Sequence, residues 1–157
     1  MSTGILRDHL SRALAWGDAH VSFDDAVEGL EPSLRGVRPD GLPHSAWELL
    51  EHLRLAQEDL LAFCTREDYR EHKWPDDYWP ASPEPPSTKA WEESVAAYRA
   101  DRAELQQLAA DPAIELEAPL PFGRGHSLIR ELLLVLDHAA YHVGQLVLVR
   151  QALAAWR

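Results

Sequence analysis

The stretch that decides the fold reads Asp137-His138-Ala139-Ala140-Tyr141-His142-Val143-Gly144-Gln145. It lies inside an apolar, proline-free segment that runs from about residue 127 to residue 156. A segment this long and this rich in Leu, Val and Ala predicts one helix of roughly seven or eight turns. Residues four apart lie on one face of a helix, so His138 and His142 project together. Two imidazoles placed in this way can share a metal ion.

Two histidines four apart also occur on helices that bind nothing, so the surroundings of the pair decide its interpretation. A helical projection places the following residues on the same face: Glu131, Leu134, Val135, Tyr141, Gln145 and Val149. Two rings among such neighbours need partners, and they would repel each other if both were protonated. A cation meets both needs, because each ring then binds in its neutral form. The pair therefore favours a metal site, with an incidental pair as the alternative.

Length and charge limit the classes of protein to consider. At 157 residues the chain suits a single domain, which we expect to span residues 1–157. It has 15 Lys and Arg against 26 Asp and Glu, a net charge of −11 with His neutral. A nucleic-acid-binding protein normally presents a basic face, and so does a protein that docks on anionic lipid. We therefore expect neither nucleic acid nor membrane as a partner.

The cysteine content and the N-terminus favour a cytoplasmic protein. Cys64 is the only cysteine, so no intrachain disulfide can form and a reducing cytoplasm is the default location. It ends an apolar stripe, which predicts a small buried hydrophobe rather than a nucleophile. No signal peptide is evident, because no basic region precedes an apolar core at the N-terminus. No run reaches 18 uninterrupted apolar residues, so we expect no membrane span.

Two helices are expected in the first half of the chain. Apolar residues recur at helical spacing from Leu6 to Leu30, which predicts a first helix that contains His20. The second helix begins at a capping box, in which the side chains of Ser45 and Glu48 each satisfy a backbone N–H that the helix leaves unpaired. His52 lies on the flank of its buried stripe.

A long irregular connection separates the second helix from the third. Residues 66–86 hold five prolines, which forbid a continuous helix. A connection this long can cross the length of a bundle, so the second and third helices need not run antiparallel. Its aromatic residues Trp74, Tyr78 and Trp79 either line a pocket mouth or pin the loop to the bundle, and we favour the second role.

The second half of the chain completes the helix count. Ser87 or Thr88 starts a third helix that runs to about residue 110, and the apolar helix begins near Ser127. These elements predict an all-α fold: a four-helix bundle with a long crossover between helices 2 and 3. His52 then becomes the natural third partner of His138 and His142.

Three histidine ligands leave an open coordination position, which is the arrangement of a catalytic metal site rather than of a closed structural one. A zinc ion there lowers the pKa of water or of a bound thiol and so makes a nucleophile near neutral pH. Imidazole ligands also suit nickel, iron and cobalt, so the residue types leave the metal open. His20 is a weaker candidate ligand, and as a fourth ligand it would favour a structural site.

Two quoted segments resemble the paired signatures of the DinB-like superfamily. They are His44-Ser45-Ala46-Trp47-Glu48-Leu49-Leu50-Glu51-His52-Leu53 and Asp137-His138-Ala139-Ala140-Tyr141-His142-Val143-Gly144-Gln145-Leu146. The resemblance extends over essentially the whole chain, since the helix count and the long middle connection also match. It implies a four-helix bundle that binds a divalent metal, usually zinc or nickel, and that often forms a homodimer. The family's metal ligands fall on His52, His138 and His142.

Relatives in this superfamily include metal-dependent transferases and isomerases that use low-molecular-weight thiols such as bacillithiol or mycothiol. The leading hypothesis is therefore thiol S-transfer to a small electrophilic substrate, with Tyr141 and Gln145 orienting a ligand or a metal-bound water. A hydrolase that activates water on the same ligands is the alternative enzyme. A non-enzymatic metal-binding stress or interaction module is a second class, and a metal-free bundle with vestigial histidines is a third. The charge balance gives no reason to expect DNA binding.

Overall fold

Four long helices pack side by side in the computed structural model, which describes residues 2–156. They are α1 (Ser2–Ala13), α3 (Ala46–Thr65), α4 (Thr88–Ala110) and α5 (Leu128–Ala152). A short helix, α2 (Phe23–Val27), packs on α5, and two single turns of 3₁₀ helix, η1 (Pro32–Leu34) and η2 (Asp76–Tyr78), lie in the connections. The all-α prediction is confirmed.

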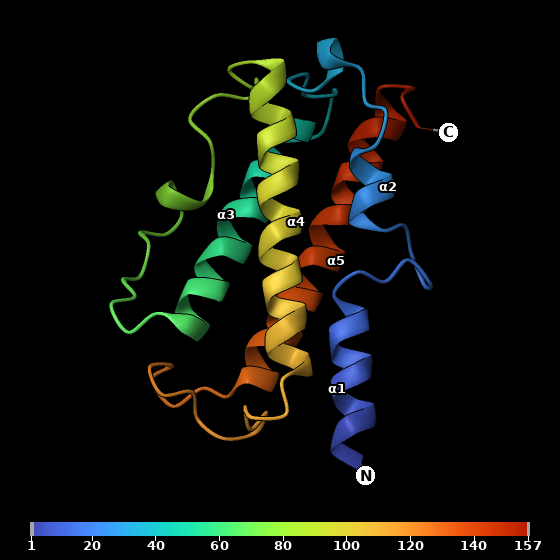
Figure 1. The fold of residues 1–157 in the computed structure, drawn as a ribbon. Coiled ribbons are helices and arrows are strands. Elements are labelled where there is room, and N and C mark those ends of the chain that lie inside the picture. The colour runs from blue at the N-terminus through green and yellow to red at the C-terminus, as the bar shows by residue number, and fades with distance from the viewer. Residues whose placement is uncertain (1, 157) are drawn as a thin grey trace.

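The direction of the helices follows from the crossover between α3 and α4. Figure 1 shows that α1 and α5 run upward while α3 and α4 both run downward. α3 and α4 can run parallel because residues 66–87 return along the outer side of α3 to the top of the bundle. The sequence predicted this long crossover from its prolines, and the structure places it beside α3.

The start of α3 is fixed by hydrogen bonds that the sequence predicts. Ser45 Oγ accepts from the backbone N–H of Glu48 at 3.2 Å, and Glu48 Oε2 accepts from the backbone N–H of Ser45 at 2.8 Å. Ser87 caps α4 in a similar way, accepting from the N–H of Ala90 at 3.1 Å. Each cap satisfies donors that the first turn of a helix leaves without a partner.

The predicted continuous first helix is wrong. α1 ends at Ala13, and the chain then forms turns until Ser22 caps α2 by accepting from the N–H of Asp25 at 3.1 Å. Leu10 of α1 and Phe23 of α2 are both buried, so the apolar residues reach the core from two separate helices rather than one. His20 lies in the turns between these helices and is exposed, whereas the sequence placed it on a helix.

The core consists of two apolar clusters, one above the other along the bundle. The upper cluster includes Leu50 of α3 and Leu146 of α5, and the lower one includes Leu61 of α3 and Leu132 of α5. Cys64 is buried in the lower cluster, and burial raises the pKa of its thiol to about 12. This confirms that Cys64 is a buried small side chain and not a nucleophile at neutral pH.

The helix α5 is central to both clusters. Among the described residues it is the one helix that is long and apolar enough to cross a membrane, a property it shares with core helices of soluble bundles. Near its end Arg150 is buried, with its Nη1 donating to the carbonyl oxygens of Ala26 at 2.7 Å and Glu28 at 2.8 Å. Its Nε donates to the carbonyl oxygen of Ala155 at 3.1 Å. Arg150 thereby fastens α2 and the C-terminal turn to α5.

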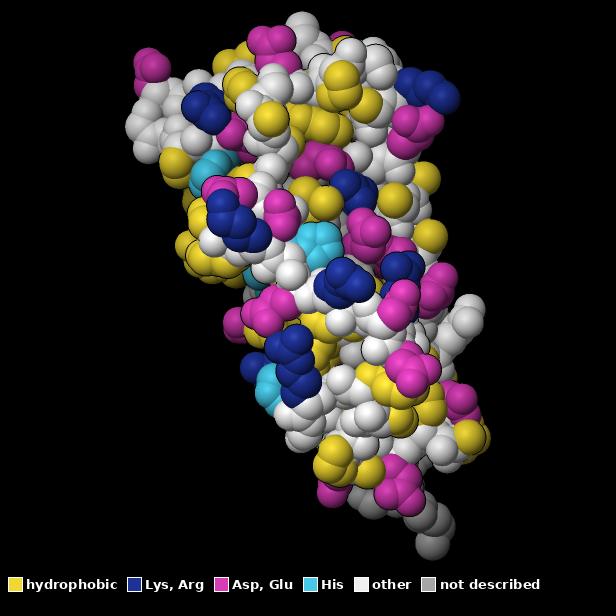
Figure 2. All heavy atoms as spheres, turned by 90° about the vertical axis from the view of Figure 1, so that its left-hand side faces the viewer, with side chains coloured by type: hydrophobic (Ala, Val, Ile, Leu, Met, Phe, Trp, Pro, Cys, Tyr) yellow, Lys and Arg dark blue, Asp and Glu magenta, His cyan; other side chains and the backbone are white. Residues whose placement is uncertain are grey.

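Charges of both signs alternate on the side of the molecule that the crossover forms. Figure 2 shows Lys and Arg side chains beside Asp and Glu side chains on this face. Two ion pairs involve residues of the crossover: Lys73 with Asp76, and Glu71 with Arg124. The Arg124 pair joins the crossover to the connection before α5.

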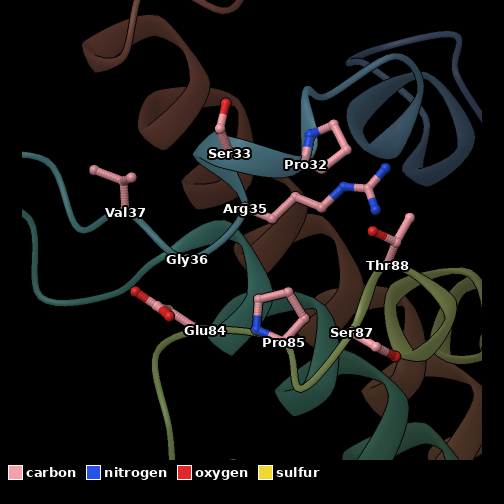
Figure 3. Close-up of a pocket in the computed structure, with 9 residues that line it drawn as sticks. All are labelled: Pro32, Ser33, Arg35, Gly36, Val37, Glu84, Pro85, Ser87 and Thr88. Carbon is pink, nitrogen blue, oxygen red and sulfur yellow. The ribbon is translucent and has the colours of Figure 1, made fainter.

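The upper end of the crossover passes very close to Gly36. Figure 3 shows Gly36 next to Glu84, in a cavity of about 260 Å³ that is also lined by Arg35, Pro85 and Thr88. A Cβ atom on Gly36 would lie 2.8 Å from the Cα of Glu84, and a backbone atom cannot move aside as a side chain can. Glycine is therefore required where these two segments meet.

We expect Gly36→Ala to lower the free energy of unfolding by about 1–3 kcal/mol, the usual range for forced overpacking. Thermal and urea denaturation measure this effect. Gly144→Ala is the matched control, because Gly144 lies within α5 and a Cβ there meets nothing within 4 Å. Alanine at that position should stabilise the helix by roughly 0.5–1 kcal/mol. Equal stability of the Gly36 variant and the parent would contradict the close approach.

Candidate metal centre

Three histidines meet between α3 and α5, at the level between the two core clusters. His52 comes from α3, and His138 and His142 come from successive turns of α5. The Nε2 atom of His52 lies 3.0 Å from that of His138 and 3.1 Å from that of His142. One ring nitrogen of each histidine lies within 4.8 Å of the others. The three side chains singled out from the sequence are therefore brought together.

The hydrogen bonds on the far side of two rings fix their tautomers. His52 Nδ1 lies 2.9 Å from the carbonyl oxygen of Tyr78, and His142 Nδ1 lies 2.7 Å from Oε1 of Gln145. Both oxygens only accept, so each Nδ1 carries the proton and donates it. Each Nε2 therefore presents a lone pair to the centre.

Those two lone pairs face each other at 3.1 Å without a proton between them. If His138 Nε2 carries a proton, it can donate a hydrogen bond to His52 Nε2. The contact between His52 Nε2 and His142 Nε2 then still has no proton. A cation among the three nitrogens satisfies all of them at once. The donor set therefore fits a divalent metal.

The spacing of the nitrogens is also close to what such an ion requires. Zinc–nitrogen bonds of 2.0–2.1 Å in tetrahedral geometry place two nitrogens about 3.4 Å apart. The distances of 3.0 and 3.1 Å are within a few tenths of an ångström of that value. The ring nitrogens of the remaining pair, His138 and His142, lie within 4.8 Å of each other, so the three rings form a group that could hold a metal ion.

Burial keeps the three rings neutral. It lowers the pKa of His138 to about 4, with further lowering by His142 and His52. Burial also lowers the pKa of His142 to about 4. The neighbouring His52 lowers this pKa further, whereas the hydrogen bond to Gln145 raises it. The pKa of His52 is lowered by burial as well. Neutral imidazoles are the form that binds a metal, so the rings are ready to bind well below pH 7.

These shifts predict how the stability of the metal-free protein depends on pH. His138 and His142 bind protons near pH 6.5 in the unfolded chain but only near pH 4 in the folded one. The unfolded state therefore holds more protons between these values, and the free energy of unfolding should fall as the pH is lowered from about 6.5 to about 4. Above pH 6.5 these two groups should contribute no further change.

Urea denaturation of chelator-treated protein at several pH values measures this slope. The variant that carries both His138→Ala and His142→Ala should lose a large part of it. An unchanged slope in that variant would assign the pH dependence to other groups.

The crossover covers one side of the centre. The indole of Trp79 stacks on His52 with ring centroids 4.0 Å apart and planes 4° apart, and it also stacks on His44 at 4.2 Å and meets His142 edge-on at 6.2 Å. Tyr78 supplies the carbonyl that holds His52, and its hydroxyl donates to Oδ2 of Asp59 at 2.7 Å. Tyr78 and Trp79 therefore pin this loop at the centre itself, whereas Trp74 is exposed.

Tyr141 and Gln145 occupy different places. Gln145 contacts His142 directly through the hydrogen bond described above. Tyr141 is 64% exposed and meets His142 edge-on, with ring centroids 4.8 Å apart. The sequence placed Tyr141 on the same face as buried residues, whereas in the structure it lies on the exposed side of α5. A role for either side chain in binding a cofactor stays a prediction.

His20 does not join the centre. It is exposed in the turns after α1, where its Nδ1 lies 2.8 Å from the carbonyl oxygen of Val21. Within residues 2–156 the group of possible ligands contains His52, His138 and His142 and no further His, Cys, Asp or Glu. A fourth protein ligand is therefore not in place among the described residues.

Three groups that support the metal centre were not predicted from the sequence. His44 and Asp59 were not singled out for this centre, and the carbonyl of Tyr78 has no signature in a sequence because every residue carries one. Asp59 follows His52 by seven residues, a spacing that places both side chains on the same face of a helix. This spacing was the one sequence feature that could have indicated a role for Asp59.

Comparison with known proteins gives one match. A model of the family described as DinB superfamily matches residues 16–146, a range that includes the crossover and all three histidines. No curated protein and no solved structure matches the chain.

Proposed function

The chain belongs to the DinB superfamily, and from this membership and its three-histidine cluster we propose a divalent-metal-binding protein that catalyses thiol S-transfer to a small electrophilic substrate. The metal ligands in this proposal are His52, His138 and His142. The observation that carries it is the meeting of three Nε2 atoms, two of which present lone pairs, with no fourth protein ligand among residues 2–156. Three ligands leave one coordination position for a reactant.

A divalent ion held there would lower the pKa of a bound thiol or water and so supply a nucleophile near neutral pH. Imidazole ligands favour zinc or nickel, and their chemistry does not separate the two. The chain itself contributes ring orientation through Tyr78 and Gln145 and exclusion of water through the Trp79 stack. Within residues 2–156 the group at the centre holds three histidines and no Asp, Glu or Cys, which favours a reaction with a good nucleophile over one that needs proton transfer.

A non-enzymatic role is the second candidate, because the centre joins α3, α5 and the crossover at one point. An ion there would hold these elements together whether or not a reaction occurs. A hydrolase would use the same ligands with water in place of the thiol. A homodimer, a cytoplasmic location, a small-molecule substrate and the absence of nucleic-acid and membrane partners stay predictions.

Elemental analysis of tag-free protein, followed by addition of a thiol to the cobalt-substituted form, tests the proposal. Near-stoichiometric metal and a new sulfur–cobalt absorption on thiol addition are expected. Metal without thiol coordination would favour the non-enzymatic role. Absence of metal after reconstitution with zinc or nickel would overturn the proposal.

Gln145→Ala should lower the zinc affinity by about 10–100-fold, the usual effect of removing a group that orients a histidine ligand. Tyr141→Ala should leave the zinc affinity nearly unchanged, because Tyr141 meets His142 only at the ring edge. Competition with a chromophoric chelator measures both affinities. Equal losses in the two variants would contradict the separate roles of these residues.

A further inference from the structure

The solvent side of the metal centre is bordered by exposed apolar side chains. Trp74 is 68% exposed and meets the ring of His52 edge-on, with centroids 6.5 Å apart. Tyr141 meets His142 edge-on at 4.8 Å, and Leu134 lies one helical turn before His138. Each of the three histidines thus has one exposed apolar neighbour, and we call Trp74, Leu134 and Tyr141 the apolar rim.

The rim combines two separate elements. Trp74 belongs to the crossover, whereas Leu134 and Tyr141 belong to α5. Trp74 also lies 5.5 Å from the ring of Tyr78, which is itself hydrogen-bonded to Asp59, so the indole has support on its inner side. Burying large apolar side chains is favourable, so three of them left exposed around one centre indicate a binding surface. Single exposed apolar residues scattered over a surface need no such explanation.

Charged groups are missing from the immediate surroundings of the described centre. The hydrogen-bond contacts of the three rings are with each other, with the carbonyl of Tyr78 and with Gln145, and the group of possible ligands contains no Asp or Glu among the residues that the structure describes. Lys73 precedes Trp74, but its ammonium group is paired with Asp76 at 2.5 Å. Asp137 precedes His138, but consecutive helical residues point about 100° apart.

Three polar side chains close to the histidines already have partners. Gln145 accepts from His142, the hydroxyl of Tyr78 donates to Asp59, and His44 stacks on Trp79. A charged substituent on a bound reactant would therefore find no oppositely charged side chain among these residues, whereas an apolar substituent would find the rings of Trp74 and Tyr141 and the side chain of Leu134.

We propose that the reactant at this centre carries an uncharged apolar group, preferably an aromatic ring, next to its metal-binding atom, and that Trp74 and Tyr141 hold this group. The inference rests on the proposed function, because it takes the three histidines as metal ligands with one open position. Aromatic pairs prefer edge-to-face or offset contacts, which both rim rings can offer to a ring that enters from solvent. Apolar contact with the rim then adds binding free energy to that of metal coordination. It thereby favours some reactants over others that share the same metal-binding atom.

Four thiols that differ only in the substituent next to the sulfur provide the test. They are benzyl mercaptan, 2-mercaptoethanol, 3-mercaptopropionate and cysteamine, which carry an aromatic, a neutral polar, an anionic and a cationic group. Each is titrated into cobalt-substituted protein, and the sulfur–cobalt absorption reports the concentration at half-saturation. Benzyl mercaptan should half-saturate the site at a concentration about tenfold lower than 2-mercaptoethanol, and the two charged thiols should gain nothing over 2-mercaptoethanol.

Variants identify the side chains responsible. Trp74→Ala and Tyr141→Ala should each reduce the benzyl preference by about 3–10-fold while leaving the half-saturation by 2-mercaptoethanol nearly unchanged. Phe122→Ala is the matched control, because Phe122 is an exposed aromatic residue at 44% exposure outside the rim. It should keep the full preference.

The outcomes separate the two proposals. Sulfur–cobalt absorption without a benzyl preference, or with tightest binding of a charged thiol, overturns the substrate class and leaves the metal centre intact. Absorption with none of the thiols overturns the open coordination position, and with it the proposed function. Rim variants that dissociate an oligomer in light scattering without changing the benzyl preference assign the rim to a subunit interface and also overturn the inference.

Discussion

Alanine in place of His52, His138 or His142 should lower the zinc affinity of the protein by more than about 100-fold. Loss of a group that merely orients a ligand already reduces affinity by about 10–100-fold, and loss of a ligand removes a metal–nitrogen bond as well. Elemental analysis after dialysis and competition with a chelator both measure this effect. His20→Ala is the matched control, because His20 is an exposed histidine away from the centre.

The same variants separate loss of a ligand from damage to the fold. In the metal-free parent the lone pairs of His52 and His142 oppose each other at 3.1 Å. Removing the ring of His52 or of His142 relieves this opposition, so the metal-free His52→Ala and His142→Ala variants should not be markedly less stable than the metal-free parent. Zinc should raise the melting temperature of the parent and of His20→Ala but not of the three ligand variants. Full zinc retention in any ligand variant would refute the assignment of that residue.

The second large effect is expected at Arg150. Arg150→Ala should lower the free energy of unfolding by about 3–5 kcal/mol, since it removes a buried charged donor from several backbone carbonyls. For a chain of this size the melting temperature should fall on the order of 10 °C. Lysine should restore only part of the stability, because one ammonium group cannot reproduce the spread of donors on a guanidinium.

Two measurements make this prediction specific. Arg12→Ala, at an exposed ion pair with Asp8 on α1, should change the stability by less than about 0.5–1 kcal/mol. Folded Arg150→Ala should still bind zinc with parental affinity, because Arg150 holds α2 and the chain end rather than the histidines. A stability change below about 1 kcal/mol would show that water replaces the guanidinium at these carbonyls.

The sequence was most informative where local interactions decide the structure. The capping box at Ser45 and Glu48 and the proline-free apolar segment give helix starts and lengths that need no knowledge of the rest of the chain. The convergence of His138 and His142 with His52 was predictable for a similar reason, since helical periodicity sets which face each ring occupies. The crossover followed from its prolines.

Features that depend on tertiary packing were missed. The apolar residues chosen between Leu6 and Leu30 fit one helical spacing, so the pattern could not reveal that Leu10 and Phe23 reach the core from two separate helices. Arg150 follows an apolar run and reads as a basic residue near a helix end, yet it is 3% exposed. The contacts of Tyr78 and Trp79 with His52 depend on the path of an irregular loop, and no periodic sequence pattern predicts that path.

The ligands of the centre are far apart along the chain, and this separation sets the order in which the centre can form. His52 is 86 residues from His138 and 90 from His142, whereas the latter two are neighbours on one helix. Closing so long a loop is entropically unfavourable until α3 and α5 have docked, so a complete site arises late in folding. An interaction formed after the transition state slows unfolding without speeding folding. We therefore expect metal supply to set the lifetime of the native chain rather than the rate at which new chains reach it.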